Sequence, residues 1–220
     1  MKILVLDIDG TITDDERRVN CKVIEVIRRL DIPIVLATGN IVCFASATAR
    51  LIGTGGIVIA ENGGVVKTSL DGKEYVLGDI VRCRRAFDLL KTHFKLEKLD
   101  SEYRGTEIAV RKNFNLDVAR AILDGANLGV NMVDSRFAIH IKDKRIDKGT
   151  GLKKVVELLG WSTEDVIAIG DAENDVEMLQ TAGLGIAVGN ADQKLKTVAD
   201  FVMEGKYGAG VIEAVERFIN

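Results

Sequence analysis

The sequence contains few of the residues on which disulfide frameworks and nitrogen- or sulfur-ligated metal centres depend. Its three cysteines lie far apart without a CxxC pair, so neither a disulfide framework nor a structural zinc site is expected. Its two histidines are too few for a His-rich metal site. Scattered thiols of this kind are typical of a reducing cytoplasm. The residues concerned are Cys21, Cys43, Cys83, His93 and His140.

Long apolar runs and an excess of positive charge are also absent. The apolar run at residues 3–6 ends at Asp7 and is too short for the core of a signal peptide. No stretch approaches the roughly 20 apolar residues of a membrane helix. Lys and Arg number 30 against 33 Asp and Glu, and this net charge of −3 gives no indication of a nucleic-acid surface. We therefore expect a soluble, cytoplasmic protein that binds neither membranes nor nucleic acid.

The chain has enough apolar sequence to form a sizeable core. Hydrophobic residues make up 47% of its 220 residues, a length that suits one large domain or one domain with an insertion. The charge is unevenly distributed. Residues 80–147 hold 14 Lys and Arg against 10 Asp and Glu, whereas the remainder holds 16 against 23. This contrast predicts an acidic core that carries a basic insertion.

Short β-branched runs alternate with amphipathic segments, a pattern typical of an α/β fold built on a parallel sheet. Near-continuous apolar runs predict strands buried on both faces at residues 2–6, 34–37, 57–60, 166–169 and 185–188. Helices are predicted at residues 21–30, 41–52, 149–159, 176–181 and 209–218, the first of them with Asn20 as its N-cap.

Residues 80–147 follow a different pattern. Segments 80–94 and 116–128 predict helices, whereas 107–111 and 137–142 alternate polar and apolar residues with period two. That alternation is typical of antiparallel strands with one face covered by helices. We therefore predict an α/β protein with a Rossmann-like parallel-sheet core at residues 1–79 and 148–220, and an inserted α+β cap domain at residues 80–147.

The motif with the clearest chemical content follows the first predicted strand, in the sequence Asp-Ile-Asp-Gly-Thr. Residues two apart on a strand share a face, so Asp7 and Asp9 can project into one site, and Gly10 allows a sharp turn after them. Sites in open parallel sheets form beyond the carboxyl ends of the strands. Other polar clusters occupy such ends or a helix start, namely Thr38-Gly39-Asn40, Lys148-Gly149 and Gly170-Asp171-Ala172-Glu173-Asn174-Asp175.

Four carboxylates are thereby expected on one rim: Asp7, Asp9, Asp171 and Asp175. Like charges at close range raise one another's pKa values unless a cation offsets them. Oxygen-only ligands favour Mg²⁺, which typically shares an oxygen with a bound phosphate. The Thr38 hydroxyl, the amides near Gly39 and the Lys148 ammonium would suit that phosphate.

These four motifs, in this order, resemble those of the haloacid dehalogenase-like phosphatase superfamily, and the similarity extends over essentially the whole chain. An α/β cap between the Thr38 and Lys148 motifs resembles the Cof-type subclass, as does the segment Glu61-Asn62-Gly63-Gly64. The compact size is most similar to archaeal-type phosphoglycolate phosphatases. The resemblance implies a Mg²⁺-dependent phosphomonoester hydrolase, a small phosphorylated metabolite such as 2-phosphoglycolate as its ligand, and a monomer or homodimer.

The resemblance also implies a role for each matching residue. Asp7 would attack phosphorus to give an aspartyl-phosphate, and Asp9 would act first as the acid and then as the base. The Asp7 carboxylate, the Asp9 carbonyl, Asp171 and Asp175 would hold Mg²⁺. Thr38, Gly39 and Lys148 would hold the phosphoryl oxygens, with Asn174 orienting Lys148.

The inserted segment is a candidate substrate reader. Its polar sheet face is expected to carry Arg111, His140 and Lys142, and Arg104 lies just before the first strand. We hypothesise that Arg104 or His140 reads the end of the substrate remote from the phosphate, since arginine matches a carboxylate bidentately. The alternative for Arg104 is an ordinary surface salt bridge.

Rival functions remain open at this point. A broad sugar-phosphate phosphatase or a phosphosugar mutase would use the same scaffold. A signalling receiver domain would also use an acidic Mg²⁺ pocket with a phosphorylated aspartate, although Asp9 and the insertion of roughly 70 residues argue against a receiver.

Overall fold

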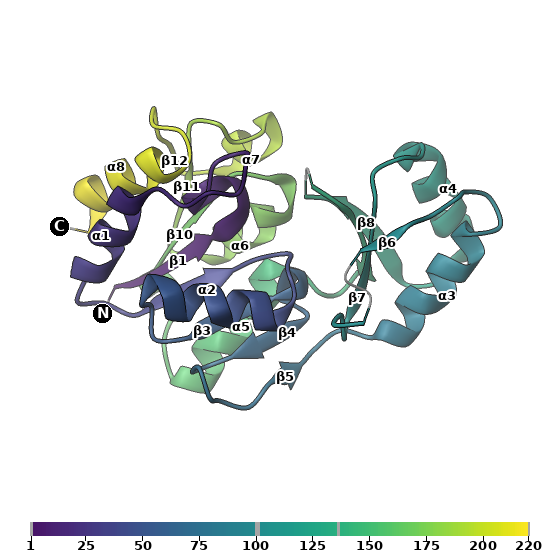
Figure 1. The fold of residues 1–220 in the computed structure, drawn as a ribbon, viewed down its shortest axis with the longest axis horizontal. Coiled ribbons are helices and arrows are strands. Elements are labelled where there is room, and N and C mark those ends of the chain that lie inside the picture. Colours follow the sequence, from purple (N-terminus) through teal and green to yellow (C-terminus); the bar gives the residue numbers. More distant parts are fainter. Residues whose placement is uncertain (1, 100–101, 136, 220) are drawn as a thin grey trace.

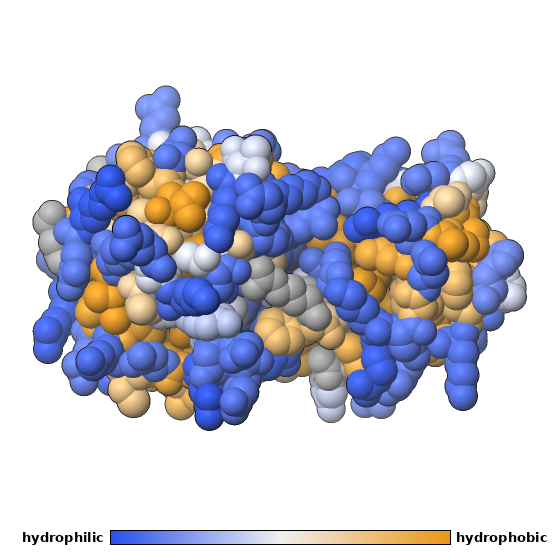
Figure 2. All heavy atoms as spheres, turned by 90° about the horizontal axis from the view of Figure 1, so that it is seen from above, coloured by the Kyte–Doolittle hydropathy of each residue, from blue (hydrophilic) through white to orange (hydrophobic). Residues whose placement is uncertain are grey.

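Two β-sheets with their covering helices make up the protein (Figure 1). The computed structural model describes residues 2–99, 102–135 and 137–219. Figure 1 shows the larger sheet on the side of both chain ends, and the smaller sheet with α3 and α4 on the opposite side. Polar side chains cover most of the surface seen from above, with apolar side chains showing between them (Figure 2). Within the described residues, no helix is both long and apolar enough to cross a membrane.

The larger sheet has eight strands in the order β12-β11-β10-β1-β2-β3-β4-β5. The strands from β12 to β3 are parallel, and β4 and β5 add an antiparallel edge. The chain leaves β1 in one direction for β2 and returns on its other side as β10, so β1 lies where the strand order reverses. The bounds are β1 Ile3–Asp7, β2 Ile34–Ala37, β3 Ile57–Ala60, β4 Val65–Lys67, β5 Tyr75–Val76, β10 Val166–Gly170, β11 Leu184–Ala187 and β12 Phe201–Val202.

Helices bury both faces of this sheet, which is why its strands are apolar on both sides. Leu4 and Leu6 of β1 pack in one cluster with α1, α2 and α8, whereas Ile3 and Val5 pack in another with α5, α6 and α7. Each such fully buried side chain stabilises the fold by about 1.5–3 kcal/mol. The helices are α1 Cys21–Arg29, α2 Val42–Ile52, α5 Lys148–Leu159, α6 Val176–Thr181, α7 Gln193–Val198 and α8 Gly208–Phe218.

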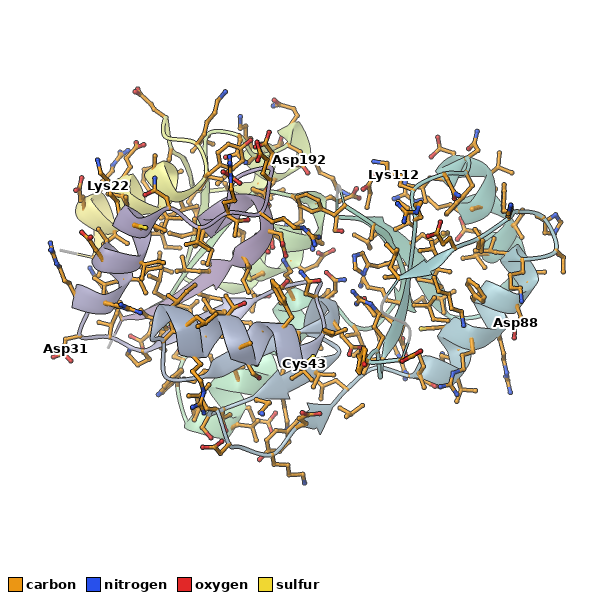
Figure 3. The ribbon with its side chains drawn as sticks, viewed as in Figure 1. Lys22, Asp31, Cys43, Asp88, Lys112 and Asp192 are labelled. Carbon is orange, nitrogen blue, oxygen red and sulfur yellow. The ribbon has the colours of Figure 1, made fainter. Side chains whose placement is uncertain are left out.

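The smaller sheet is antiparallel throughout, in the order β6-β7-β9-β8. Ile108, Val110, Ile139 and Ile141 pack beneath α3 and α4, as the period-two alternation predicts. Asp88 lies on the outer side of this helical layer, away from the larger sheet (Figure 3). The bounds are β6 Lys98–Leu99, β7 Glu107–Val110, β8 Val130–Asp134, β9 Ile139–Asp143, α3 Ile80–Leu90 and α4 Leu116–Ala126.

The chain passes from the larger sheet to the smaller one between β5 and α3, and returns between β9 and α5. α3 begins at Ile80 and α5 at Lys148, close to the junctions expected from the sequence. The fold therefore confirms the class expected from the sequence, a mixed α/β protein with a parallel-dominated sheet and an inserted α+β segment. The division into two domains with those bounds stays a prediction.

Several details differ from the sequence-based expectations. The helices expected to reach residues 94 and 128 end at Leu90 and Ala126. The strands β4, β5, β6, β8 and β12 and the helix α7 were not predicted. Asn20 caps α1 as expected, its side chain accepting a hydrogen bond from the Lys22 amide. Short helical turns at Ile8–Ile12, Glu61–Gly63, Thr163–Asp165 and Glu173–Asp175 complete the structure.

Candidate active site

The chain turns sharply directly after Asp7, the last residue of β1. The turn Ile8–Ile12 passes through Gly10, whose φ of +91° is a conformation that other residues adopt only under strain. A Cβ atom at Gly10 would lie 2.4 Å from Oδ2 of Asp171, so no larger residue fits there without displacing that carboxylate. The glycine therefore lets the β1 loop lie directly against Asp171 at the end of β10.

Three buried carboxylates converge at this point. Ligand oxygens of Asp7, Asp171 and Asp175 lie within 4.8 Å of one another, and these residues are only 4%, 1% and 0% exposed. Lys148, at the start of α5, is also fully buried and donates to Oδ1 of Asp7 and to Oδ1 of Asp175, each at 2.6 Å. Lys148 was expected to hold a phosphoryl oxygen, and the structure places its ammonium on these two carboxylates.

The electrostatics of this cluster leave it short of positive charge. Burial and the Asp175 and Asp171 carboxylates raise the pKa of Asp7 well above its usual value, although Lys148 acts in the opposite direction. Burial acts to lower the pKa of Lys148, but Asp175 and Asp7 outweigh it and raise that pKa. One ammonium faces three carboxylates, so a further cation would relieve the repulsion among them.

The cluster has the chemistry of a magnesium site. Its donors are carboxylate oxygens, which Mg²⁺ prefers. The Oδ2 atom of Asp7 is buried and has no hydrogen-bond partner within the part of the chain that the structure describes. A buried anionic oxygen without a partner is unfavourable, and a cation at that oxygen would remove the penalty. The residues present therefore fit Mg²⁺.

The side chain of Asp9 points to the neighbouring strand end. Its Oδ2 accepts hydrogen bonds from the Thr38 hydroxyl at 3.2 Å and from the Asn40 amide at 2.7 Å. Thr38 is itself fixed because its backbone amide donates to the Ile59 carbonyl at 2.9 Å. The four carboxylates expected on one rim thus divide into a cluster of three and a separate, hydrogen-bonded Asp9. Which of them bind metal stays a prediction.

The polar face of the smaller sheet turns toward this site and carries a buried charge network. Glu107 accepts from Arg104 at 2.5 Å, pairs with His140 Nδ1 at 2.6 Å, and accepts from the Asn62 amide at 2.9 Å. Arg104 also donates to the Gly39 carbonyl at 2.9 Å. Burial acts to raise the pKa of Glu107, but His140 and Arg104 outweigh it and lower that pKa. Arg104 is thus buried and does not form a surface salt bridge.

The segment Glu61–Gly63 links the larger sheet to this network. Glu61 accepts from the Thr106 amide at 2.8 Å and from its hydroxyl at 2.6 Å, and burial raises the pKa of Glu61. Asn62 accepts at 2.9 Å from the amide of Asn174. Asn174 was expected to orient Lys148, but the structure places its amide on Asn62 instead. Asn174 is thereby linked through Asn62 to Glu107 of the inserted segment.

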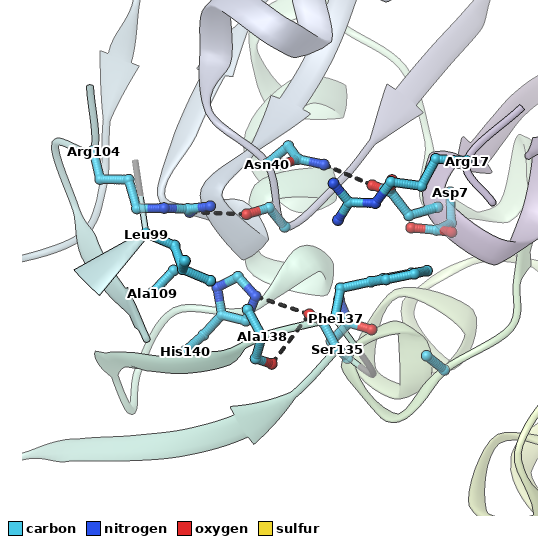
Figure 4. A pocket seen from close by; sticks show the side chains of 14 residues that line it. Asp7, Arg17, Asn40, Leu99, Arg104, Ala109, Ser135, Phe137, Ala138 and His140 are labelled. Carbon is cyan, nitrogen blue, oxygen red and sulfur yellow. Dashed lines mark hydrogen bonds and ion pairs between the residues drawn. The ribbon is translucent and has the colours of Figure 1, made fainter. Parts of the chain in front are cut away.

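A cavity of about 310 Å³ lies between the acidic cluster and the polar sheet face. Figure 4 shows Asp7, Arg17 and Asn40 on one side of it, and Arg104 and His140 on the other, with Phe137 nearby. Arg104, His140 and Gly39 were expected here from the sequence. Asn40 belongs to the Thr38-Gly39-Asn40 cluster expected at this rim, whereas Arg17, Ser135 and Phe137 were not expected to line a site. Phe137 belonged to the segment 137–142 predicted as a strand, but β9 begins only at Ile139.

Two other residues expected on the open sheet face behave differently. Arg111 is exposed and pairs with Glu97 at 2.8 Å. Lys142 is buried, only 5% exposed, and donates to the Ile146 carbonyl. Burial lowers the pKa of Lys142. Neither side chain is therefore free to approach the cavity in this conformation.

The fold and the site identify the class of protein. The sequence profile described as haloacid dehalogenase-like hydrolase matches residues 4–96 and 112–215, and the chain belongs to this family. It is therefore an enzyme of the hydrolase class, and the signalling-receiver alternative is dropped.

Curated relatives are similar over nearly the full length. The phosphoglycolate phosphatase of Methanosarcina acetivorans is 49% identical, with 98% of this chain and 95% of the relative covered. Its counterpart from Archaeoglobus fulgidus is 48% identical, with coverages of 98% and 96%. Among solved structures, a Thermoplasma acidophilum protein has a TM-score of 0.89 at 23% identity, with coverages of 99% and 98%. The sucrose-phosphatase of Synechocystis has a TM-score of 0.76 at 16% identity, with coverages of 99% and 97%. These two structures show the shared fold.

Proposed function

We propose that this protein is a magnesium-dependent phosphomonoester hydrolase that converts 2-phosphoglycolate to glycolate and phosphate. The observation that carries this proposal is the pairing of Asp7 and Asp9 at the end of β1. Asp7 has a buried oxygen without a partner in the described residues, and Asp9 lies on the wall of a cavity large enough for a small ester. The names of the curated relatives support the substrate.

In the first step Asp7 attacks phosphorus. A carboxylate oxygen forms a bond to phosphorus while the bond to the leaving oxygen breaks, and Asp9 gives that oxygen its proton. Lys148 donates to Oδ1 of Asp7 and holds the carboxylate in position for the attack. In the second step water attacks phosphorus, Asp9 takes its proton, and the bond between Asp7 and phosphorus breaks to release phosphate.

The transferring phosphoryl group needs donors that are already in place. The Thr38 hydroxyl, the backbone amide of Gly39 and the Lys148 ammonium are the proposed donors, and preorganised donors of this kind supply much of the rate enhancement. Mg²⁺ held by Asp7, Asp171, the Asp9 carbonyl and Asp175 would offset the charge of the phosphate and the carboxylates. Asn174 and Asn62 are proposed to hold the segment beside this site in position.

The inserted segment, proposed as a cap domain at residues 80–147 over a core at residues 1–79 and 148–220, supplies the opposite wall of the cavity. Arg104 and His140 line that wall. The Nε atom of Arg104 is buried and has no hydrogen-bond partner among the described residues, so its N–H can donate to a ligand oxygen. We test their role with Arg104→Ala and His140→Ala. An unchanged preference for 2-phosphoglycolate over uncharged esters in both variants would remove them from substrate reading.

A second candidate is a phosphatase or mutase for sugar phosphates. The cavity favours it, since about 310 Å³ exceeds the needs of a two-carbon acid. A panel of phosphomonoesters, assayed with Mg²⁺ and with EDTA, separates these candidates. Phosphate release fastest from 2-phosphoglycolate supports the first, and faster release from sugar phosphates supports the second. Transfer of the phosphoryl group within a sugar, without release, identifies a mutase.

We also propose a location, an oligomeric state and a ligand for the enzyme. A cytoplasmic location is supported by the free thiols of Cys21, Cys43 and Cys83. A monomer or homodimer is proposed, and sedimentation of the purified protein distinguishes the two. A small phosphorylated metabolite is the proposed ligand.

A further inference from the structure

Arg17 occupies a position in the cavity that the proposed mechanism leaves unused. It extends from the loop after β1, and its guanidinium faces Asp9, with Nε 3.4 Å from Oδ1. The guanidinium carbon also lies 4.4 Å from the centre of the Phe137 ring on the opposite side of the cavity. Figure 4 shows the Arg17 side chain reaching into the space beside Asn40 and Asp7. Arg17 thus reaches from the loop after β1 to Phe137 of the inserted segment.

The guanidinium of Arg17 is paired less closely with a carboxylate than that of Arg104 is. Arg104 is bonded to Glu107 at 2.5 Å, and both side chains are almost fully buried. The separation of 3.4 Å between Arg17 and Asp9 exceeds the 2.7–2.9 Å of a charge-assisted hydrogen bond. The Arg17 side chain is 47% exposed. Most of its five donors are therefore available to an anion entering the cavity.

The loop holds this arginine in a defined orientation. Asp14 accepts hydrogen bonds from the amides of Glu16 at 3.0 Å and Arg18 at 2.9 Å, so the loop closes on itself. Arg17 lies at its tip with a φ of +62°, a left-handed conformation that a non-glycine residue adopts only when the surrounding structure enforces it. The guanidinium carbon also lies over the Phe137 ring, a cation–π contact that favours this orientation.

The chemistry of the proposed substrate places its second anion at this point. Asp9 must lie within hydrogen-bonding distance of the leaving oxygen, because it protonates that oxygen. In 2-phosphoglycolate the carboxylate carbon is only two bonds from the leaving oxygen. A cation beside Asp9 is therefore also beside the substrate carboxylate. A planar guanidinium pairs with a carboxylate through two parallel hydrogen bonds.

We propose that Arg17 binds the carboxylate of the substrate and is the specificity-determining residue of the site, with Phe137 as the positioning residue that fixes its guanidinium. This inference rests on the proposed function. Arg104, which donates to Glu107 and to the Gly39 carbonyl, would then position these groups in place of reading the carboxylate. The enzyme would thus recognise a short phosphorylated carboxylic acid from the loop that carries its catalytic aspartates.

The test compares 2-phosphoglycolate with ethyl phosphate, which has a methyl group in place of the carboxylate. The ratio of kcat/KM for the two substrates is measured for the wild type, Arg17→Gln, Arg17→Lys and Phe137→Leu. We expect Arg17→Gln to lower this ratio by about 10- to 100-fold, mainly through KM for 2-phosphoglycolate. Arg17→Lys should lower it less, since lysine keeps the charge and loses the planar fork. Phe137→Leu should lower it by a smaller factor than Arg17→Gln.

Arg18→Gln is the matched control, because Arg18 is the adjacent exposed arginine and pairs with Asp14 and Glu16 outside the cavity. Its ratio should equal that of the wild type, and thermal melting verifies that every variant is folded. An unchanged ratio in Arg17→Gln, or an equal fall with Arg18→Gln, overturns the proposal. Failure of the proposed function is seen separately, as absent hydrolysis or absent preference for 2-phosphoglycolate in the wild type.

Discussion

Replacing the nucleophile should stabilise the metal-free protein. The uncharged variant Asp7→Asn keeps an oxygen that can accept from Lys148, and it removes one of three carboxylates whose oxygens lie within 4.8 Å of one another. At neutral pH Asp7 is ionised in the unfolded chain, and its raised pKa in the folded state means that the fold must either bury that charge or take up a proton. Both make folding less favourable than it would be with a neutral side chain. Relief of one poorly compensated buried charge is expected to add about 1–3 kcal/mol to the free energy of unfolding in EDTA.

Magnesium should make the wild type more stable than Asp7→Asn. At a concentration 100-fold above its dissociation constant, a ligand that binds only the folded state stabilises it by about 2.7 kcal/mol. For a chain of this length that corresponds to about 5–10 °C in Tm. Mg²⁺ should stabilise Asp7→Asn much less, because the variant lacks the carboxylate whose Oδ2 has no hydrogen-bond partner among the described residues of the wild type.

Thermal melting of both proteins in EDTA and in Mg²⁺ measures this crossover. We expect the variant to melt higher in EDTA and the wild type to melt higher in Mg²⁺. A variant that melts lower in EDTA would refute the reasoning that the empty cluster is electrostatically strained. Equal gains from Mg²⁺ in the two proteins would refute the placement of the metal at Asp7.

Three further predictions concern single groups. In EDTA the raised pKa of Asp7 means that the folded state holds a proton more tightly than the unfolded state. The stability that Asp7 contributes is therefore lost as the pH rises above the usual aspartate range, and Tm should fall more steeply with pH for the wild type than for Asp7→Asn. Parallel curves of Tm against pH would contradict this. Glu107→Gln leaves Arg104 and His140 without their carboxylate and should lower the free energy of unfolding, measured by urea denaturation, by about 3–5 kcal/mol. A loss below about 1 kcal/mol would mean that the network is not coupled. Arg111→Gln removes an exposed pair and should leave both the urea denaturation midpoint and kcat/KM nearly unchanged. A tenfold fall in kcat/KM would return Arg111 to the site.

The catalytic core was predictable because its signals are local. The apolar runs of β1, β2 and β10 are buried on both faces, and strands of that kind end in the loops that carry Asp7, Thr38 and Asp171. Lys148 was predicted to face the site, but its complete burial between Asp7 and Asp175 was not, because that pairing depends on the folded chain. The convergence of Asp7, Asp171 and Asp175 follows from the strand order, whereas the separate position of Asp9 depends on its bonds to Thr38 and Asn40.

The wall opposite the nucleophile was less predictable, because its residues depend on partners far away in the chain. Glu107 reads as a surface residue in an alternating strand, yet it is 1% exposed because Arg104, His140 and Asn62 surround it. β5 and β6 have two residues each, which is too short for any periodicity. Arg17 gave no signal in a polar loop, since only the folded chain brings Phe137 against it.

The central claim is that Asp7 is the nucleophile of a magnesium-dependent phosphatase. Its most direct test is phosphate release from 2-phosphoglycolate by the wild type and by Asp7→Asn, each with Mg²⁺ and with EDTA. We expect rapid release only for the wild type with Mg²⁺, and a loss of about 10⁴-fold or more in the variant. Release that persists in EDTA, or in Asp7→Asn with Mg²⁺, would contradict the account.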